Sequence, residues 1–468
     1  MTEDEYVNMT ATDIQRAVLS RNISPVEIVT AALSRLEKVE PSLNAFVTVT
    51  QDKAISSAKA IERKLLNGES VGLLAGIPLS IKDLIDVAGV PTTYGSRVMA
   101  ANVAESDAPA VERALQAGAC VLGKTTTTEF GAKSGESSSP LSGVTRNAWN
   151  LMKTAGGSSS GAATSVSARV SPLAISTDGG GSSRIPPSFC GVLGIKPQFG
   201  RIPIFPSGAT PTLSHVGIIA RNVCDASLLL SSLSGYDARD PHSIHEDPLD
   251  WMENSSNDVS KMRIAWSPTL GYAKPTQEIL SITGAAVGEL QRLGCNIDEV
   301  NDVFDKDPLD VFTAEFYAGA VARIKPMLAK HINHIDPTIL KSIEPAADLT
   351  LGDYNGFVQS RYQIRETVRQ IFEKYDALIT PTVPTVAFDI GHESPPEFPE
   401  LDANSWVYYT YPFNLSGNPA ASIPCGFSSS GMPVGLQIIT AAYAENTLLS
   451  VAAAYEMATS WNHQFPTI

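Results

Sequence analysis

A glycine-rich turn near the middle of the chain carries residue types suited to attack on a carbonyl group. Three glycines, Gly179–Gly181, are followed directly by Ser182. Consecutive glycines let neighbouring backbone N–H groups point at one spot, where they can stabilise an oxyanion. Asp178 before the run and Arg184 after it indicate a pinned turn rather than a flexible loop. Ser182 is therefore a candidate nucleophile.

A serine hydroxyl needs a base before it can attack, and Lys82 is a candidate for that base. It ends the short apolar segment Gly76–Lys82, which predicts a buried strand. Burial disfavours the ammonium form, and a neutral lysine can take a proton from serine, as in Ser-Lys variants of the catalytic triad. The alternative is a charged Lys82 that pairs with Asp83 or Asp86. The lysine alone does not decide between the two.

Two further segments match known motifs in an unsuitable context. Gly118–Thr125 matches the phosphate-binding pattern G-x-x-x-x-G-K-T, but its middle residues are apolar and predict a buried strand. Gly157–Gly161 matches the nucleophile elbow G-x-S-x-G, which would use Ser159 and a later histidine such as His215. An elbow needs an apolar strand before it, and residues 150–155 make a poor strand. We favour neither interpretation.

Helices and strands alternate along the chain, which is typical of an α/β protein. Ser24–Glu27 predicts a helix start with a capping box. Residues 237–261 carry seven acids against two bases, and predict a solvated connection between two halves. The other expected helices cover 107–117, 161–170, 277–293 and the segment after Glu445; the expected strands are 119–122, 173–175, 263–266, 296–300, 377–380, 422–425 and 435–439.

Composition argues against several classes of protein. The 468 residues are 43% hydrophobic and carry a formal charge of -15. No basic cluster is interleaved with aromatic residues, so we expect no nucleic-acid partner. No apolar run approaches about 18 residues and no secretory signal is visible, so we expect a cytoplasmic protein without a membrane partner. The five scattered cysteines predict reduced, buried thiols. The seven histidines form no metal-ligand set.

Taken together, the candidate segments resemble the amidase signature family. The order and spacing of Lys82, Ser158 and Ser182 agree with that family, and the likeness covers nearly the whole chain. The segments that carry it are Gly76–Lys82, Gly156–Ser159, Thr177–Arg184, Phe189–Pro197, Pro419–Pro424 and Gly431–Ile439.

The resemblance implies a serine hydrolase that cleaves amide-type bonds through an acyl-enzyme. In this scheme Ser182 is the nucleophile, Ser158 is a bridging serine held by a cis peptide bond, and Lys82 is the base. The oxyanion hole would consist of the N–H groups of Gly179, Gly180, Gly181 and Ser182. The residues expected to support the site by hydrogen bonding are Ser159, Asp178 and Arg184.

The resemblance also implies the fold: a single α/β domain over residues 1–468, with a mixed central β-sheet of about eleven strands flanked by α-helices. We expect an N-terminal helical region at about 1–65, a catalytic core at about 66–236, and a C-terminal half at about 262–468 that shapes the substrate pocket. No metal or organic cofactor is implied. Three positions depart from the family pattern, namely Ser160, Gly179 and Ser183, and all three catalytic groups are kept.

Within the family, the alternatives are a stand-alone amidase and the glutaminase subunit of a tRNA-dependent amidotransferase. That subunit typically carries an acid shortly before its Pro-x-Asn motif, where this chain has Val407, within the uncharged aromatic run Trp406–Tyr411. A basic, methionine-containing signature that is expected in the glutaminase subunit is also missing around 340–352, which favours the stand-alone amidase. An inactive binding homologue is disfavoured, because the three catalytic groups are present.

An uncharged aromatic flank favours a pocket for an apolar or aromatic group. We therefore expect a small-molecule amide or carbamate substrate, such as an aryl or alkyl amide, an anilide, an ester or a urethane. The proline-rich acidic segment 390–402 is hypothesised to be a lid over the pocket entrance. A monomer or homodimer is expected.

Overall fold

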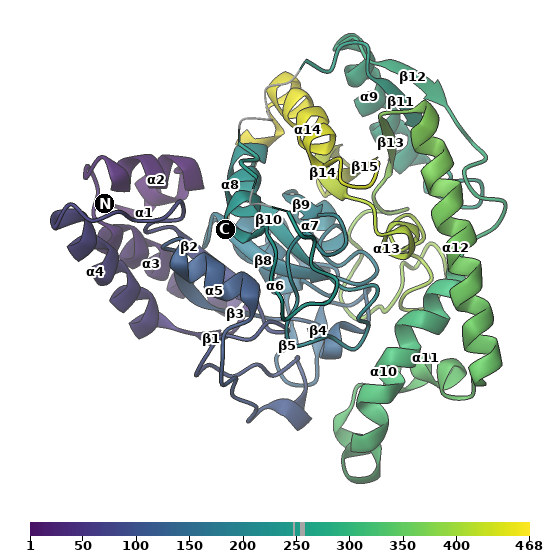
Figure 1. Ribbon diagram of the computed structural model, residues 1–468, viewed down its shortest axis with the longest axis horizontal. Helices are drawn as coiled ribbons and strands as arrows, with labels where there is room; N and C mark the ends of the chain where they lie inside the picture. Colours follow the sequence, from purple (N-terminus) through teal and green to yellow (C-terminus); the bar gives the residue numbers. More distant parts are fainter. Residues whose placement is uncertain (247–248, 253–257) are drawn as a thin grey trace.

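The computed structural model describes residues 1–246, 249–252 and 258–468 and is built around one large β-sheet (Figure 1). The sheet has eleven strands in the order β1-β3-β2-β8-β10-β9-β14-β15-β13-β11-β12. Strand β2 is parallel to β3 and β8, and β11 is parallel to β12 and β13, whereas the other neighbours are antiparallel. The predicted α/β fold with a mixed sheet of about eleven strands is confirmed. The strands are β1 (Phe46–Val49), β2 (Pro78–Lys82), β3 (Cys120–Thr125), β8 (Leu173–Asp178), β9 (Leu193–Lys196), β10 (His215–Ala220), β11 (Arg263–Trp266), β12 (Asn296–Glu299), β13 (Ala377–Pro381), β14 (Ala420–Phe427) and β15 (Pro433–Thr440).

Helices surround this sheet, with α1 to α4 on one side of the molecule and α10 to α12 on the other (Figure 1). The α-helices are α1 (Glu3–Val7), α2 (Ala11–Leu19), α3 (Pro25–Leu43), α4 (Gln51–Leu66), α5 (Pro109–Gln116), α6 (Ser160–Ser167), α7 (Ile185–Cys190), α8 (Val223–Leu233), α9 (Gln277–Arg292), α10 (Leu309–His331), α11 (Pro337–Ala347), α12 (Leu351–Lys374), α13 (Pro412–Ser416) and α14 (Glu445–Thr459). Short 3-10 turns lie at Arg97–Met99, Glu129–Gly131, Ile332–His334 and Trp461–His463.

The start of α3 shows why its sequence forms a helix there. The Ser24 side chain accepts a hydrogen bond from the Val26 N–H, and the Glu27 carboxylate accepts one from the Ser24 N–H. Pro25 occupies the first helical position, where its fixed φ suits a helix and its missing N–H costs nothing. The predicted capping box is thus confirmed, and the helix ends at Leu43.

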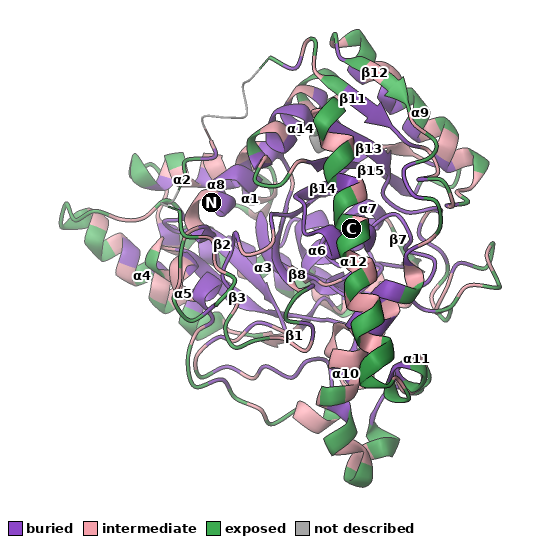
Figure 2. Ribbon diagram, turned by 45° about the vertical axis from the view of Figure 1, so that its right-hand side comes forward, coloured by how far each residue is buried: buried purple, intermediate pink, exposed green. Residues whose placement is uncertain are grey.

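The middle of the sheet is buried on both faces, as Figure 2 shows for β2 and β8. Every residue of β2 is buried, and β8 is buried except at Thr177. Because helices cover both faces, side chains on both sides of these strands are buried, including the polar Ser80 and Ser176. Ile81 of β2 lies beside Ile175 of β8 in parallel register. The carboxyl ends of the two strands therefore meet at one edge of the sheet, which brings Lys82 close to Thr177.

The structure confirms the prediction made for the segment that matches the phosphate-binding pattern, but not the one made for the residues before the G-x-S-x-G match. Cys120–Thr125 is strand β3, as predicted, and Lys124 within it pairs with Asp83 at 3.1 Å. The prediction of a poor strand over 150–155 was wrong, since Asn150–Thr154 forms β7. It pairs with β6 (Arg146–Asn147) in a separate two-stranded hairpin, where backbone pairing suits even a mostly exposed polar segment. It lies outside the central sheet, from which a nucleophile elbow would rise. A second small hairpin joins β4 (Ser138–Ser139) to β5 (Gly143–Val144).

The acidic connection 237–261 differs from its prediction in the part that the structure describes; residues 247–248 and 253–257 lie outside the described residues. Asp240 is buried and its carboxylate accepts the Ile204 N–H at 2.8 Å. The Trp251 indole is buried and donates to Ser234 Oγ. The segment is therefore anchored to the protein at two points rather than solvated throughout.

All five cysteines are free thiols, of which Cys120, Cys190 and Cys295 are buried and Cys224 and Cys425 are half-buried. No helix in the described part of the chain is both long enough and apolar enough to cross a membrane.

Candidate active site

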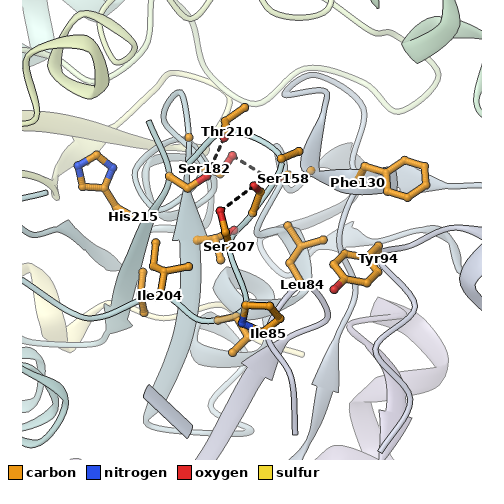
Figure 3. A pocket seen from close by; sticks show the side chains of 18 of the residues that line it. Leu84, Ile85, Tyr94, Phe130, Ser158, Ser182, Ile204, Ser207, Thr210 and His215 are labelled. Carbon is orange, nitrogen blue, oxygen red and sulfur yellow. Dashed lines mark hydrogen bonds between the residues drawn. The ribbon is translucent and has the colours of Figure 1, made fainter. Parts of the chain in front are cut away.

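The three candidate catalytic side chains meet in one continuous hydrogen-bonded row. Lys82 Nζ lies 2.7 Å from Ser158 Oγ, and Ser158 Oγ lies 2.9 Å from Ser182 Oγ. All three side chains are buried, with Lys82 fully inaccessible and Ser182 only 7% exposed. Figure 3 shows Ser158 and Ser182 at the pocket, with Tyr94 and Phe130 to one side and His215 to the other. A proton can pass along this row, because each step spans one hydrogen bond.

Lys82 is the last residue of β2, and this position sets the contacts of its side chain. Its Nζ is also 2.8 Å from Ser159 Oγ and 3.4 Å from the Thr177 carbonyl oxygen. Burial lowers the pKa of Lys82 well below its ordinary value of 10.5, although the Asp178 carboxylate opposes this shift. The alternative of a charged Lys82 paired with Asp83 fails, since Asp83 pairs with Lys124 instead. Among the described residues, no ion pair joins Lys82 to Asp83 or Asp86, and burial disfavours its charged form.

The turn before α6 presents Ser158. The peptide bond between Gly157 and Ser158 is cis, as the family resemblance implies. Ser159 follows at the N-terminus of α6, and its hydroxyl donates to the Thr177 carbonyl oxygen at 3.1 Å. Ser159 contacts Lys82 and Thr177 rather than His215. The triad of a nucleophile elbow is therefore not assembled.

The glycine-rich turn Gly179–Ser182, called the glycine nest below, differs from its prediction at one amide. The Gly181 N–H donates to Asp178 Oδ1 at 2.7 Å, so it is engaged within the turn and does not face a ligand. Within the described part of the chain, no acceptor is found for the amides of Gly179, Gly180 and Ser182. Gly181 itself has a φ of +138°, and a Cβ there would meet the Thr410 side chain. Glycine is thus required at this position by both conformation and space.

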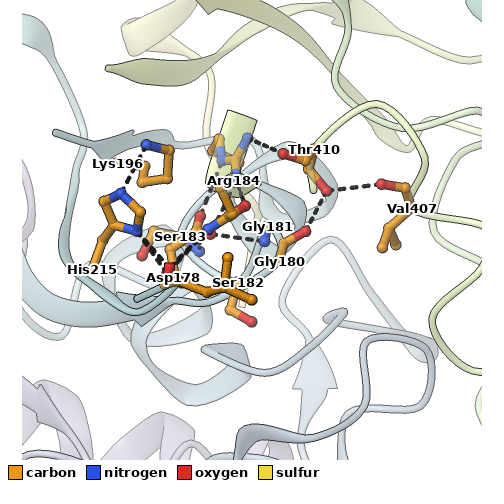
Figure 4. Close-up of polar contacts among 12 residues, drawn as sticks. Asp178, Gly180, Gly181, Ser182, Ser183, Arg184, Lys196, His215, Val407 and Thr410 are labelled. Carbon is orange, nitrogen blue, oxygen red and sulfur yellow. Dashed lines mark hydrogen bonds and ion pairs between the residues drawn. The ribbon is translucent and has the colours of Figure 1, made fainter. Parts of the chain in front are cut away.

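A buried ion pair holds the nest in shape (Figure 4). Arg184 donates to both oxygens of Asp178 at 3.0 Å, in the bidentate geometry that gives strong and directional pairs. The Ser183 N–H donates to the same carboxylate. Burial alone would raise the pKa of Asp178, but the Arg184 guanidinium and Lys196 hold it well below the ordinary value. The turn is therefore pinned at both ends, as the sequence indicated.

The C-terminal half completes this ion pair with residues that sequence reasoning did not assign to the site. Arg184 donates to Asn414 Oδ1, to Gln437 Oε1 and to the Thr410 carbonyl oxygen. Thr410 Oγ1 also donates to the Gly180 carbonyl oxygen at 2.6 Å. The only sequence signal was the polar Asn414 within an apolar segment, because a buried amide needs partners.

Lys196 and His215 form a second buried pair that the sequence did not reveal. Lys196 Nζ lies 3.2 Å from His215 Nε2, and His215 Nδ1 donates to the Leu213 carbonyl oxygen at 2.7 Å. With the hydrogen on Nδ1, Nε2 is free to accept from Lys196. Burial lowers the pKa of both side chains well below their ordinary values. His215 Nδ1 also lies 3.3 Å from the Asp178 carbonyl oxygen, so this pair packs against the glycine-rich turn.

The walls of the pocket are mostly apolar. Leu84, Ile85 and Phe130 come from the N-terminal half, and Phe316 and Ile324 come from α10. The segment 203–210 covers another side of the cavity. Two charged residues, Asp86 and Arg323, also line it. No group of three or more His, Cys, Asp or Glu side chains among the described residues is arranged to hold a metal ion.

Two predictions about the pocket were wrong. The aromatic run Trp406–Tyr411 does not line it but packs into the core of the C-terminal half, where the Trp406 ring stacks on Phe189. The buried tyrosines there have protein acceptors, as for the Tyr409 hydroxyl on the Pro268 carbonyl oxygen. Segment 390–402 contributes no residue to the cavity lining.

Instead of covering the pocket, segment 390–402 is fastened to other parts of the protein. Glu393 forms an ion pair with the buried Lys133 at 2.7 Å and accepts from Thr338 Oγ1. The lid hypothesis therefore does not describe this segment. The loop that does line the cavity is 203–210.

Two of the departures from the family pattern have different surroundings. Ser183 Oγ shares a 2.7 Å hydrogen bond with Ser176 Oγ. Ser160 begins α6, and its buried hydroxyl has no hydrogen-bond partner among the described residues. Neither side chain touches the Lys82–Ser158–Ser182 row.

Comparisons with known proteins identify the family of the chain. A family model described as Amidase matches residues 27–449. An acylamidase from Rhodococcus erythropolis is 34% identical over 472 residues, which cover 100% of this chain and 98% of the relative. A glutamyl-tRNA(Gln) amidotransferase subunit from Gloeothece citriformis is 33% identical over 490 residues, covering 97% of this chain and 99% of the relative. The solved structure of a bacterial aryl acylamidase of the amidase signature family superposes with a TM-score of 0.91 at 28% identity, covering 97% of each chain.

The fold and the family match define a hydrolase of amide bonds. The chain belongs to the amidase signature family.

Proposed function

We propose that this protein is a stand-alone amidase in which Ser182 is the nucleophile, Ser158 the proton relay and Lys82 the base. The observation that carries the proposal is the row of hydrogen bonds from Lys82 Nζ through Ser158 Oγ to Ser182 Oγ, which opens into an apolar pocket. Ser159, Asp178 and Arg184 position these groups without touching the substrate.

In the first half-reaction, Ser182 Oγ attacks the carbonyl carbon of the amide. Its proton passes to Ser158, whose own proton passes to the neutral Lys82. The amides of Gly179, Gly180 and Ser182 stabilise the oxyanion of the tetrahedral intermediate. The C–N bond then breaks as Ser158 returns a proton to the leaving amine and regains one from Lys82. This leaves an ester between Ser182 and the acyl group.

In the second half-reaction, water replaces the amine. Ser158 takes a proton from the water while Lys82 again takes the proton of Ser158. The resulting tetrahedral intermediate collapses, the bond between acyl carbon and Ser182 Oγ breaks, and the proton returns to Ser182. The products are a carboxylic acid and the amine. Every proton donor and acceptor in this cycle comes from the chain or the substrates, so we propose that no metal or organic cofactor takes part.

The pocket supports aryl or alkyl amides and anilides as the substrate class. Its walls at Leu84, Phe130 and Phe316 offer apolar and aromatic contact rather than hydrogen bonds. Carbamates and esters present a carbonyl carbon of the same geometry to Ser182, so we include them in the proposed range. The two main regions of the chain then have different roles. Region 66–236 holds the reacting groups, and region 262–468 shapes the pocket through α10.

The alternative is a glutaminase subunit of an amidotransferase, which the relative from Gloeothece citriformis favours. At the position where that subunit typically carries an acid, this chain has Val407, whose side chain is buried in an apolar cluster. Its carbonyl oxygen lies 2.9 Å from Thr410 Oγ1. No charge is available at Val407 to bind the ammonium group of glutamine, which supports the stand-alone amidase.

Hydrolysis of a small substrate panel tests the proposal. The panel holds glutamine, a primary aliphatic amide, an anilide, an aryl ester and an aryl carbamate. We expect turnover of the anilide by the purified chain and its loss in Ser182→Ala. Ser207→Ala is the matched control, because Ser207 lines the pocket outside the proton row. Activity on glutamine alone, or activity only with added partner subunits, would favour the amidotransferase.

A further inference from the structure

Arg323 is a cation on the wall of an otherwise apolar pocket. It lies on α10, next to the pocket residue Ile324. Among the residues that the structure describes, no carboxylate pairs with its guanidinium. By contrast, Arg361 of the neighbouring α12 pairs with Glu315 of α10 at 2.6 Å. Arg323 is half-buried and is not used in the ion pair that joins these helices.

The guanidinium of Arg323 is held in place by Tyr94. It lies 4.3 Å from the centroid of the Tyr94 ring, which also lines the pocket. Stacking on an aromatic face orients the planar guanidinium. Arg323 also interacts with the Tyr94 hydroxyl, and no carboxylate among the described residues takes up its remaining N–H groups. Burial raises the pKa of Tyr94, Asp86 raises it further, and Arg323 lowers it. All three side chains line the cavity.

Asp86 also lines the cavity, and its charge is opposite to that of Arg323. Its Oδ1 is buried and has no hydrogen-bond partner. It also acts on Lys124, whose pKa it raises against the lowering effect of burial. Of the two charged residues on the cavity wall, Asp86 already interacts with the buried Lys124, whereas Arg323 has no carboxylate partner among the described residues.

We propose that Arg323 binds a carboxylate on the substrate, remote from the scissile bond, and that amides carrying such a carboxylate are the preferred substrate class. This inference rests on the proposed function, because the carboxylate is placed in the pocket that opens onto Ser182. A guanidinium matches a carboxylate in a bidentate way, and the apolar walls make that contact stronger than it would be in water. The apolar part of the substrate would lie against Phe130 and Phe316.

Matched pairs of substrates test this inference. The first series consists of mono-anilides of dicarboxylic acids with four to six carbons, compared with the anilides of the corresponding monocarboxylic acids. The second compares 4-acetamidobenzoate with acetanilide. We expect a carboxylate to raise kcat/KM in at least one series, and Arg323→Gln to raise KM for those substrates by about 10- to 100-fold. Neutral substrates should change less than about twofold.

Control variants separate the inference from its rivals. Lys325→Gln removes an exposed positive charge from the same helix and should leave the preference intact. Equal rates for carboxylate and neutral substrates, or an equal loss on both in Arg323→Gln, would overturn the inference while the proposed function stands. A preference for ω-amino acyl anilides that is lost in Asp86→Asn would overturn it too, since Asp86 would then be the anchor.

A binding measurement covers the case in which no amide is hydrolysed. Calorimetric titration of Ser182→Ala with 4-acetamidobenzoate and with adipate needs no turnover. Binding that disappears in the double variant with Arg323→Gln would support a carboxylate site even if the proposed amidase function fails. Absence of binding to Ser182→Ala together with the absence of turnover would refute both.

Discussion

Removing the hydroxyl of Ser158 tests the proton relay most directly. The structure shows no direct hydrogen bond between Lys82 and Ser182; each is bonded to Ser158 Oγ, at 2.7 and 2.9 Å. Ser158→Ala therefore separates base from nucleophile without removing either. A positioned acid–base group contributes about 10²- to 10⁴-fold to rate, so we expect kcat to fall by about 10³-fold or more, or about 4 kcal/mol in activation free energy.

The same substitution should have a modest effect on stability. Lys82 keeps its contacts with Ser159 Oγ and the Thr177 carbonyl oxygen, so the buried amine is not left without partners. Loss of the two hydrogen bonds of Ser158 Oγ, at about 1 kcal/mol each, costs about 2 kcal/mol in free energy of unfolding. The assay is kcat/KM on the anilide, together with denaturant unfolding. Activity of Ser158→Ala within tenfold of the unaltered enzyme, in a folded protein, would refute the relay.

Three further predictions concern charge. The proposed role of Lys82 as a neutral base, with a pKa lowered by burial, predicts that kcat/KM rises with pH through that lowered value and levels off well below pH 10.5. A pH–rate profile still rising at pH 10.5 would contradict this role. Arg184→Met leaves Asp178 as an unpaired buried charge and should lower the free energy of unfolding by about 3–5 kcal/mol, with partial recovery in the double variant with Asp178→Asn; a loss below about 1 kcal/mol would show that the pair is not needed. Burial raises the pKa of Glu456 to about 7. The folded state therefore binds this proton more tightly than the unfolded state, and the stability that the proton contributes is lost as pH rises from about 4.5 to 7. Glu456→Gln should flatten that part of the plot of unfolding free energy against pH, and an unchanged slope, measured by denaturant unfolding, would contradict the prediction.

The central elements could be predicted from the sequence because their local signals agree with their tertiary environment. Gly76–Lys82 predicts a buried strand, and β2 is buried at every position. The capping box at Ser24 is formed as expected. Asn150–Thr154 was missed because its strand is stabilised by backbone pairing with β6 and not by apolar burial, which is the signal that periodicity detects.

The pocket shows where sequence reasoning fails. Trp406–Tyr411 was expected to face the substrate, since its aromatic side chains suit an apolar ligand. The same side chains suit a protein core equally well, and they pack there with their hydroxyl groups on protein acceptors. Arg323 and Phe316 were not predicted, because a long helix far along the chain carries no local mark of the cavity it lines.

The chemistry of the site follows from residue types and their order along the chain: the lysine, the two serines and the glycine nest point to acyl transfer by serine. The geometry of the site comes from the packing of the folded chain. The parallel pairing of β2 and β8 places Lys82 within reach of Ser158, and the turn engages the Gly181 amide with Asp178. The same packing puts Arg323 rather than the aromatic run on the pocket wall. The physical reason is that contacts between residues distant in sequence depend on how the sheet and helices pack, and local patterns do not encode that packing.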